Sequence, residues 1–397
     1  MQTERMSELL DIYRDGLLKD TLRFWIPRSI DQEYGGYLTA LDQDGSVLHT
    51  DKAVWVQGRF AWLLATLCNT VERRPEWLEL SRHGIDFLNR HCFDADGRMF
   101  FSVTRDGRPL RKRRYLFSEA FAVIALAALG IATGEEPFKR QALDLFRLIL
   151  RYHTTPGLLP PKVIPATRPM KSLAMPMILI VTSQELRKAV DDPICSEVID
   201  RSIREIESDF LKPEFECVLE MVGPGGEFYD TYEGRTVCPG HAIEAGWFAL
   251  EEARQRNNDE RLIALGTKII DWSLKTGWDP QYGGIVYYSD ARGLPGTEYA
   301  HDMKLWWPHN EAIIATLLAH ELTGAPRYEQ WHRTVHDWAY AHFPDRLHGE
   351  WFGYLHRDGT VSTRLKGNMW KGPFHLPRMQ LYCWKRLEEM LAQGIQP

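Results

Sequence analysis

Hydrophobic and polar positions follow two helical patterns that alternate along the chain. In the first pattern apolar residues return on one side only, as Leu262, Leu265 and Ile269 do at helical spacing. These stretches predict surface helices, over roughly residues 7–27, 76–92, 136–153, 194–211, 259–275 and 327–343. In the second pattern small and apolar residues occupy every side and charges are few. These stretches predict buried helices, over roughly residues 52–67, 116–132, 172–189, 240–255, 307–321 and 374–391.

A glycine-containing turn separates each surface helix from the buried helix that follows it. Examples are EYGGY at Glu33–Tyr37 and QYGGIVYY at Gln281–Tyr288. One glycine from each turn gives the series Gly35, Gly97, Gly157, Gly225, Gly283 and Gly349, at intervals of 62, 60, 68, 58 and 66 residues. Alternating aromatic and polar residues around several of these glycines predict short hairpins. The chain therefore repeats one helical hairpin six times.

Six alternating pairs of helices predict two concentric rings, with the buried helices inside. We expect an all-α fold, an (α/α)6 barrel made of six helical hairpins with short β-hairpin loops at one end. No Ser/Gly-rich linker or charge block divides the chain, so a single domain is expected over residues 1–397. An open helical solenoid is the alternative, and it would require a shorter repeat and polar capping units. A parallel α/β sheet is unexpected, because no series of strands separated by helices is present.

Composition narrows the classes of function. The chain carries 48 Lys+Arg and 54 Asp+Glu, a net charge of −6, so it lacks the basic footprint of a nucleic-acid partner. The first residues contain no apolar signal core, and the apolar run from Ala120 to Ala132 is too short to span a membrane. The six cysteines include no CxxC pair, so no disulfide framework is expected. We therefore expect a cytoplasmic protein without a membrane partner.

Candidate site residues are the polar and aromatic side chains at the starts of the buried helices. All these starts follow the glycine turns, so they should lie at one end of the barrel and surround a pocket. Polar groups there need a purpose, because burying them unpaired is costly. The candidates are Trp55, Gln57 and Arg59 on the first buried helix, Lys171 and Met175 on the third, His241 and Glu244 on the fourth, Lys304, Trp307, His309 and Glu311 on the fifth, and Trp370 and His375 on the sixth.

Several candidates also have a purely structural interpretation. Arg59 can pair with an inner carboxylate, and Glu244 or Glu311 can be that partner. His309 can be a core histidine with satisfied hydrogen bonds, and the tryptophans can fill the mouth of the barrel while also stacking on a ligand. The remaining histidines, such as His83, His91, His332 and His336 on the predicted surface helices, are expected to be solvated or to cap helices.

Several familiar chemistries lack their sequence motifs. The chain has no HExxH motif and no compact His/Cys/Asp cluster in sequence, so no metal site is predicted. Glycine-rich nucleotide motifs and the GxSxG elbow are also missing. The expected pocket instead holds two histidines, cations, carboxylates and indole rings. This set of groups suits proton transfer on a polyol.

Three long motifs resemble the N-acylglucosamine 2-epimerase family. They are WWPHNEA at Trp306–Ala312, PGHAIEAGW at Pro239–Trp247 and KGPFHLPR at Lys371–Arg378, and VWVQGR and KSLAMPM fit the same pattern. The resemblance runs through nearly the whole chain. It implies a six-hairpin barrel, usually a homodimer, that acts on the free reducing end of a sugar. It further implies that His241 and His375 are the catalytic acid/base pair and that Arg59 contacts the reducing-end oxygens. No cofactor is implied as a requirement, whereas ATP is implied as an activator that is not consumed.

Two departures point to one branch of this family. Disaccharide epimerases and aldose–ketose isomerases of the wider superfamily carry a further histidine on the third inner helix, but residues 172–189 contain none. The fifth inner helix also reads WWPHNEA and not the WW-x-QAEA type of those relatives. Both features favour interconversion of N-acylglucosamine and N-acylmannosamine. The alternatives are epimerisation or aldose–ketose isomerisation of unmodified hexoses such as mannose and glucose, glycoside hydrolysis by Glu244 and Glu311, and binding without catalysis.

Overall fold

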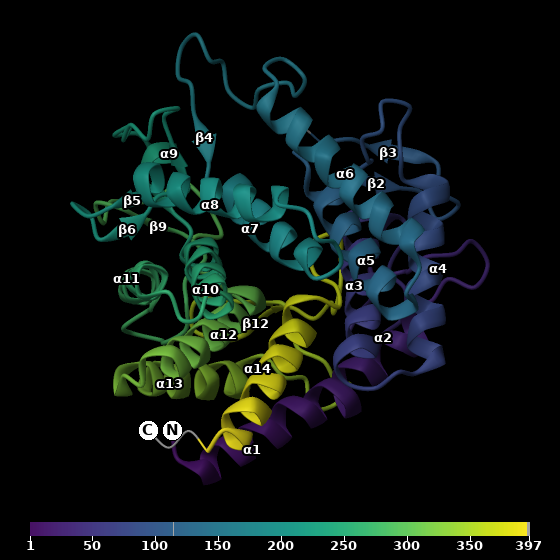
Figure 1. The fold of residues 1–397 in the computed structure, drawn as a ribbon. Coiled ribbons are helices and arrows are strands. Elements are labelled where there is room, and N and C mark those ends of the chain that lie inside the picture. Colours follow the sequence, from purple (N-terminus) through teal and green to yellow (C-terminus); the bar gives the residue numbers. More distant parts are fainter. Residues whose placement is uncertain (114, 395–397) are drawn as a thin grey trace.

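The computed structural model describes residues 1–113 and 115–394 and contains paired helices arranged in two concentric rings (Figure 1). The inner ring consists of α3 (Val54–Thr70), α5 (Phe117–Thr133), α7 (Ala174–Arg187), α10 (Pro239–Gln255), α12 (Trp306–Thr323) and α14 (His375–Ala392). The outer ring consists of α1 (Thr3–Asp15) with the π-helical turn η1 (Gly16–Thr21) and α2 (Leu22–Ser29), α4 (Pro75–His91), α6 (Glu136–Thr154), α8 (Ile194–Glu205) with η2 (Ile206–Phe210), α11 (Glu260–Gly277) and α13 (Pro326–His342). A short helix, α9 (Tyr232–Arg235), precedes α10. The predicted (α/α)6 barrel is confirmed.

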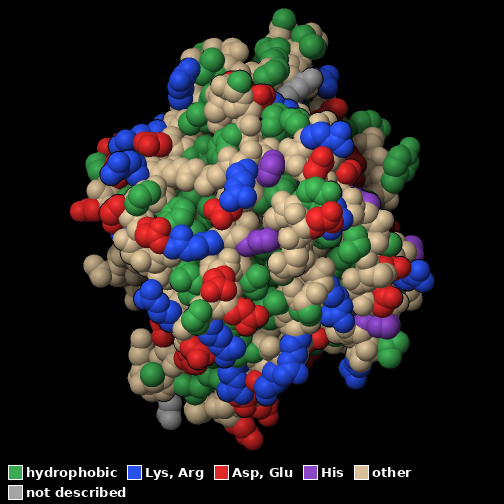
Figure 2. All heavy atoms as spheres, turned by 90° about the vertical axis from the view of Figure 1, so that its right-hand side faces the viewer, with side chains coloured by type: hydrophobic (Ala, Val, Ile, Leu, Met, Phe, Trp, Pro, Cys, Tyr) green, Lys and Arg blue, Asp and Glu red, His purple; other side chains and the backbone are tan. Residues whose placement is uncertain are grey.

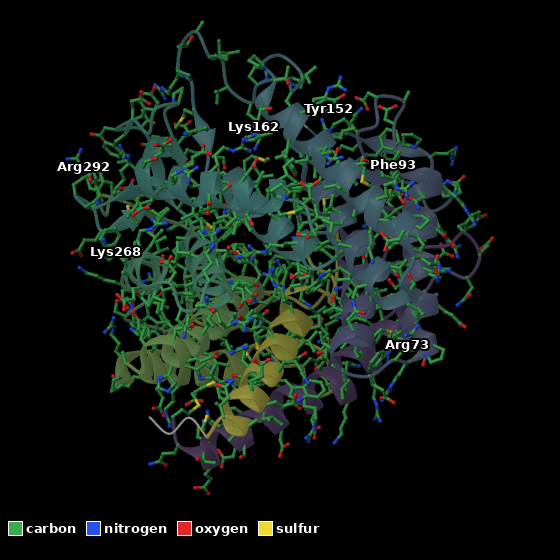
Figure 3. The ribbon with its side chains drawn as sticks, in the orientation of Figure 1. Arg73, Phe93, Tyr152, Lys162, Lys268 and Arg292 are labelled. Carbon is green, nitrogen blue, oxygen red and sulfur yellow. The ribbon has the colours of Figure 1, made fainter. Side chains whose placement is uncertain are left out.

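The two rings differ in the way their residues are buried. On α11, Leu262, Leu265 and Ile269 are buried, whereas Lys268 is exposed and points away from the barrel (Figure 3). On α5, every residue from Ser118 to Gly130 is buried. A helix that is apolar all round is stable only with neighbours on all sides, which is the position of an inner helix.

Close backbone contact between inner helices depends on small residues. A Cβ atom added at Gly58 of α3 would lie 2.8 Å from the carbonyl carbon and oxygen of Phe121 on α5. Glycine at this position therefore allows the two helices to pack tightly.

The inner helices follow one another around the ring in chain order, each against its outer partner. The ring closes where Phe374, next to the start of α14, packs against Trp62 of α3 with ring centroids 5.5 Å apart. Helix α1 packs along α14, so the first and the last helix lie side by side (Figure 1). The prediction of a single domain also covers residues 114 and 395–397, which lie outside the described residues.

Short antiparallel strands gather at the end of the barrel where the inner helices begin. They form the groups β1 (Lys52–Ala53), β2 (Ser102–Val103) and β3 (Pro109–Arg111); β10 (Lys304–Leu305), β11 (Tyr354–Leu355) and β12 (Val361–Thr363); β4 (Lys171–Ser172) with β7 (Met221–Val222); β5 (Leu211–Lys212) with β6 (Cys217–Val218); and β8 (Thr236–Val237) with β9 (Ser289–Asp290). Strands β1, β4, β8 and β10 lie at the starts of α3, α7, α10 and α12. Each pairs with a strand from a later turn, as Lys52 opposite Val103 shows, so the hairpins link neighbouring units.

Buried ion pairs stabilise three of the glycine turns. In each turn an aspartate accepts backbone N–H bonds from the residues two and three positions later and binds a fully buried lysine. The pairs are Asp31 with Lys52 at 2.9 Å, Asp279 with Lys304 at 3.0 Å, and Asp345 with Lys366 at 3.0 Å. Because breaking a buried pair leaves an uncompensated charge, each pair fixes its turn against the next unit.

Two of the histidines on outer helices lie in the core, which corrects the sequence prediction for them. His332 and His336 of α13 are buried, and both contact the Tyr13 hydroxyl, at 3.1 and 2.9 Å. Burial lowers the pKa of His336 to about 3 and that of His332 well below its usual value. The prediction failed because α1 covers this face of α13, which the spacing within 327–343 does not reveal.

The molecular surface mixes both charge signs. Figure 2 shows Lys/Arg and Asp/Glu side chains interspersed over one face of the molecule. This face therefore lacks the continuous basic field typical of nucleic-acid binding. Among the described residues, none of the helices combines the length and apolar character needed to cross a bilayer.

We predict that Lys304→Met lowers the free energy of unfolding by about 2 kcal/mol, because Asp279 loses its buried lysine partner and keeps only the ion pair with the more exposed Arg357. Denaturant unfolding followed by circular dichroism measures this change. Lys268→Met, at an exposed position of α11, is the matched control and should stay within about 0.5 kcal/mol of wild type. A loss equal to that of the control would show that the pair does not stabilise the fold.

We also predict that stability falls as the pH drops below about 6.5. His309, His332 and His336 have lowered pKa values in the folded chain, so between the folded and unfolded pKa values the unfolded chain binds more protons. Their contribution is complete above the unfolded pKa and declines toward the folded values of about 3 for His309 and His336. Urea unfolding at pH 7.5 and 5.5 measures the effect, and equal free energies at the two pH values would contradict it.

Candidate functional site

A cavity of about 920 Å³ occupies the interior of the barrel. All six inner helices contribute to its wall. Its lining includes Trp55 and His375 near the starts of their helices, as well as Thr70 and Gln255 at the ends of α3 and α10. The cavity therefore follows the barrel axis, and the predicted site lies at the end where the helices begin.

His375 stands at the start of α14 and is held by a carboxylate of the neighbouring inner helix. Its Nδ1 lies 2.7 Å from Oε1 of Glu311, so Nδ1–H donates to the carboxylate and Nε2 is left for the cavity. Burial, reinforced by the charges of Arg378 and Arg59, lowers the pKa of His375 to about 3 despite the contact with Glu311. His375 is therefore neutral at physiological pH and can accept a proton.

Arg378, one turn further along α14, neutralises the carboxylates near His375. Its guanidinium lies 2.6 Å from Glu311 and 2.9 Å from Glu244. Burial alone would raise the pKa of Glu311, but Arg378 and His375 lower it to about 2. Glu311 also accepts an indole N–H from Trp247 at 2.9 Å. Glu311 thus has three partners and acts by orienting His375, whereas Glu244 lines the cavity.

Glu244 differs from Glu311 although the two share Arg378. Burial, together with the charge of Glu311, raises the pKa of Glu244 to about 6. A carboxyl group with this pKa can hold or release a proton near neutral pH. Glu244 is therefore suited to hydrogen-bond a hydroxyl group of a ligand in the cavity.

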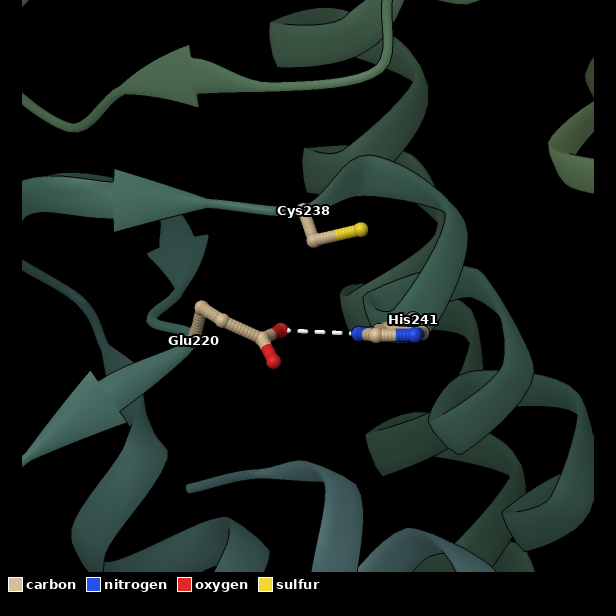
Figure 4. A group of neighbouring side chains, drawn as sticks. All are labelled: Glu220, Cys238 and His241. Carbon is tan, nitrogen blue, oxygen red and sulfur yellow. Dashed lines mark hydrogen bonds and ion pairs between the residues drawn. The ribbon is translucent and has the colours of Figure 1, made fainter. Parts of the chain in front are cut away.

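His241, in the first turn of α10, is held by Glu220 from the turn between β6 and β7 (Figure 4). Its Nδ1 lies 2.9 Å from Oε2 of Glu220, so Nδ1–H donates and Nε2 is again left for the cavity. Burial alone would lower the pKa of His241, but Cys238 and Glu220 raise it well above its usual value. His241 therefore carries a proton at physiological pH.

The two histidines meet on one aromatic surface. The Trp307 ring centroid lies 5.2 Å from that of His241 and 5.7 Å from that of His375. All three residues line the same cavity. The structure thus brings together two imidazoles that are far apart in the sequence, one neutral and one protonated.

Arg59 of α3 supplies a positive charge without a carboxylate partner. Its side chain is 8% exposed, and no hydrogen bond or ion pair joins its guanidinium to another described residue. The guanidinium carbon instead lies over the Trp55, Phe121 and Phe374 rings, at 4.7, 4.1 and 4.6 Å from their centroids. Burial and the charge of Arg378 lower the pKa of Arg59 to about 9, which still leaves it charged near neutral pH. An anion or an oxygen-rich ligand would complete its coordination.

Three further predicted residues also line the cavity. Trp55 is anchored by an N–H bond to the Met369 carbonyl at 2.7 Å, and Trp370 packs edge-on against it at a centroid distance of 5.3 Å. Met175 contributes apolar surface from α7. Lys162, in the segment between α6 and β4, adds a cation to the wall (Figure 3). The wall of the cavity therefore combines the aromatic rings of Trp55 and Trp370 with the positive charge of Lys162.

Apart from Glu311, which orients His375 from behind the wall, four predicted residues do not line the cavity and have structural partners instead. Gln57 is fully buried and exchanges hydrogen bonds with the backbone of Tyr37. Lys304 belongs to the repeated Asp–Lys pairs described above. His309 binds the Leu305 carbonyl at 2.6 Å and the Ile285 N–H at 2.8 Å.

Lys171 is the fourth of these residues. It forms ion pairs with Glu205 and Asp209 on the outer side of its unit. The expectation that these four residues bind substrate is therefore corrected, because packed neighbours already satisfy their polar groups.

Two charged residues of this site fall outside the set of predicted site residues: Glu220, which the sequence did not indicate, and Arg378, which is a polar residue at the start of the sixth inner helix. Glu220 lies between two very short strands, where no periodic pattern distinguishes it. Arg378 was visible inside KGPFHLPR, three residues after His375, a spacing that places both side chains on one helix face. That spacing was the available signal.

Two groups of three side chains have the composition of metal ligands. Glu220, Cys238 and His241 form one group, and Glu244, Glu311 and His375 form the other. Within each group, one ligand atom per residue lies within 4.8 Å of the others. The members of each group come from separate segments, so the sequence shows no compact motif for either group.

Comparison with known proteins gives a sequence family that matches most of the chain. The family model described as N-acylglucosamine 2-epimerase (GlcNAc 2-epimerase) matches residues 36–375. The N-acylglucosamine 2-epimerase of Bos taurus is 36% identical over 400 residues, covering 98% of this chain and 94% of that protein.

Two solved structures share the fold at lower sequence identity. The cellobiose 2-epimerase of Spirochaeta thermophila has a TM-score of 0.84 at 22% identity, with 98% of both chains covered. A D-mannose isomerase has a TM-score of 0.81 at 17% identity, with 95% of this chain and 97% of the other covered. With the family model spanning most of its length and the bovine relative nearly all of it, this chain belongs to the N-acylglucosamine 2-epimerase family.

Proposed function

We propose that the protein is a sugar 2-epimerase that interconverts N-acylglucosamine and N-acylmannosamine, of which the N-acetyl forms are the simplest. The observation that carries the proposal is geometric: His375 and His241 line one cavity, both rings lie against Trp307, and Arg59 of the same wall has no hydrogen-bond or ion-pair partner among the described residues. Similarity to the bovine enzyme over nearly the whole chain supports the same substrate class.

The chemistry requires a stabilised negative charge. A sugar C2 proton becomes removable only when the ring opens and C1 is a carbonyl. Its removal gives an enediolate, and donors placed in advance lower the energy of that charge. Arg59 suits this task because a guanidinium can bind two adjacent oxygens and has no competing partner among the described residues.

Inversion at C2 requires one proton to leave from one face and another to arrive on the opposite face. A neutral base and a protonated acid must therefore be present together. His375 and His241 meet this requirement in the ligand-free chain, because Glu311 is neutralised by Arg378 whereas Glu220 has His241 as its ion-pair partner. In one direction His375 removes the proton and His241 delivers one, and the roles reverse in the other direction.

The acyl preference is supported by the wall formed by α7. Ala174, Met175 and Ile178 line the cavity and offer apolar surface to an acyl methyl group. The alternative is epimerisation or aldose–ketose isomerisation of an unmodified hexose. It is favoured by the fold shared with a D-mannose isomerase, and a ketose product would establish it.

Glycoside hydrolysis and binding without catalysis have less support. Hydrolysis needs two carboxylates beside the substrate, yet Glu311 is fully buried and does not line the cavity. Binding alone gives no reason for opposite charge states on two neighbouring histidines.

Four finer expectations accompany the proposal. They are a cytoplasmic location, a homodimer, a reaction that requires no added cofactor, and activation by ATP without its consumption. The cytoplasmic location stays a prediction from composition, and the other three stay predictions from the family resemblance. The homodimer is checked by sedimentation, and ATP activation by assaying turnover and ADP release together.

We predict that the protein interconverts N-acetylglucosamine and N-acetylmannosamine and that the product formed in D2O carries deuterium at C2. NMR identifies product and label together, with glucose and mannose as competing substrates in separate reactions. Either His241→Ala or His375→Ala should lower turnover by about 10²–10⁴-fold, since each group transfers a proton.

His356→Ala is the matched control for this experiment, because His356 is exposed and should keep wild-type turnover. Product without solvent deuterium would argue against two exchangeable bases. A ketose product would replace the proposal by the isomerase alternative.

We predict that kcat/KM declines on the alkaline side as His241 loses its proton. The pKa of His241 is raised largely by its acidic neighbours, so Glu220→Gln should move this decline to lower pH. The measurement is a pH–rate profile of both proteins from pH 6 to 10. An unchanged alkaline limb in the variant would show that Glu220 does not set the charge of His241.

A further inference from the structure

Cys238 transfers no proton in the proposed reaction, but its side chain lies beside His241. It lies between β8 and α10 and is buried, and Figure 4 shows it as a neighbour of Glu220 and His241. One ligand atom from each of the three residues lies within 4.8 Å of the other two. Glu220 and His241 both line the cavity, so the group is reached from the substrate side.

Electrostatics distinguishes this group from the second one, formed by Glu244, Glu311 and His375. In the second group the Arg378 guanidinium already binds both carboxylates, at 2.9 and 2.6 Å. A cation placed there would meet a fixed positive charge at contact distance. In the first group, no Lys or Arg of the described chain forms an ion pair with Glu220, whose ion-pair partner is His241.

The donor atoms of the first group select a class of cation. Thiolate, imidazole and carboxylate are the ligands of Zn²⁺ and of ions with similar coordination, whereas Mg²⁺ and Ca²⁺ prefer oxygen alone. Three protein ligands and one position open to a cavity is the arrangement of an accessible tetrahedral site.

We propose that Glu220, Cys238 and His241 form a binding site for Zn²⁺ or a cation of similar chemistry, and that its occupancy inhibits the enzyme. The cation binds the Cys238 thiolate and the neutral His241 ring, so the thiol proton and the extra ring proton are released to solvent. His241 then coordinates metal and is withdrawn from proton transfer. The binding site stands on the geometry, whereas the inhibition rests on the proposed function.

Cobalt spectroscopy tests the site without any assay of activity. The metal-free full chain is titrated with Co²⁺, and a thiolate-to-cobalt charge-transfer band should appear and disappear when Zn²⁺ is added. Cys238→Ser should abolish the band. Cys68→Ser, which removes a more accessible thiol on α3 outside the cavity lining, should keep it.

A second ligand variant guards against a fold defect in Cys238→Ser. Glu220→Gln keeps the side-chain volume and should weaken Co²⁺ binding by about tenfold or more, while its circular dichroism spectrum stays that of wild type. A wild-type chain without the band, or a band that persists in Cys238→Ser, would overturn the proposal.

Inhibition is measured separately on the epimerase reaction. Zn²⁺ should inhibit wild type, Mg²⁺ at the same concentration should not, and Cys238→Ser should raise the inhibitory Zn²⁺ concentration by about tenfold or more relative to its own uninhibited rate. Equal Zn²⁺ sensitivity in wild type and Cys238→Ser would overturn the inhibitory role. If none of the four sugars is turned over, the proposed function fails, and the cobalt band still decides the site.

Discussion

The contact of Arg378 with Glu311 and Glu244 is the interaction on which the inner ring and its chemistry both depend. It joins α14 to α12 and α10, with guanidinium-to-carboxylate distances of 2.6 and 2.9 Å, within the first two turns of these helices. Removing one member would leave buried charge without compensation, at a cost of several kcal/mol. The same contact leaves Glu311 free to orient His375, so the stability of the ring and the position of the base arise together.

Different surroundings then shift the pKa values of the two histidines in opposite directions. Both rings donate Nδ1–H to a glutamate, at 2.7 Å for His375 and 2.9 Å for His241. Burial and the charges of Arg378 and Arg59 lower the pKa of His375 despite its contact with Glu311. Cys238 and Glu220 raise the pKa of His241. Similar hydrogen bonds to a carboxylate therefore do not fix the protonation state, because the other charged neighbours of each ring differ.

Buried ion pairs in the repeated turns hold the starts of the inner helices in place. Asp–Lys pairs such as Asp279 with Lys304 stabilise the turns, and the strands that follow lead into the inner helices. Side chains that begin those helices consequently project from fixed positions into the cavity. Arg59 has no hydrogen-bond or ion-pair partner among the described residues, and this open position points to the ligand.

The paired helices, their inner and outer order, and the candidate residues His241, Trp307 and His375 were all predictable from the sequence. They were predictable because helical spacing places apolar residues on one face regardless of distant segments, and because these motifs are contiguous. The structural roles of Lys304 and His309, and the contact of Glu220 with His241, became visible only in the folded chain. A polar side chain binds or reacts according to which groups face it, and those groups arrive from other turns of the ring only when it closes.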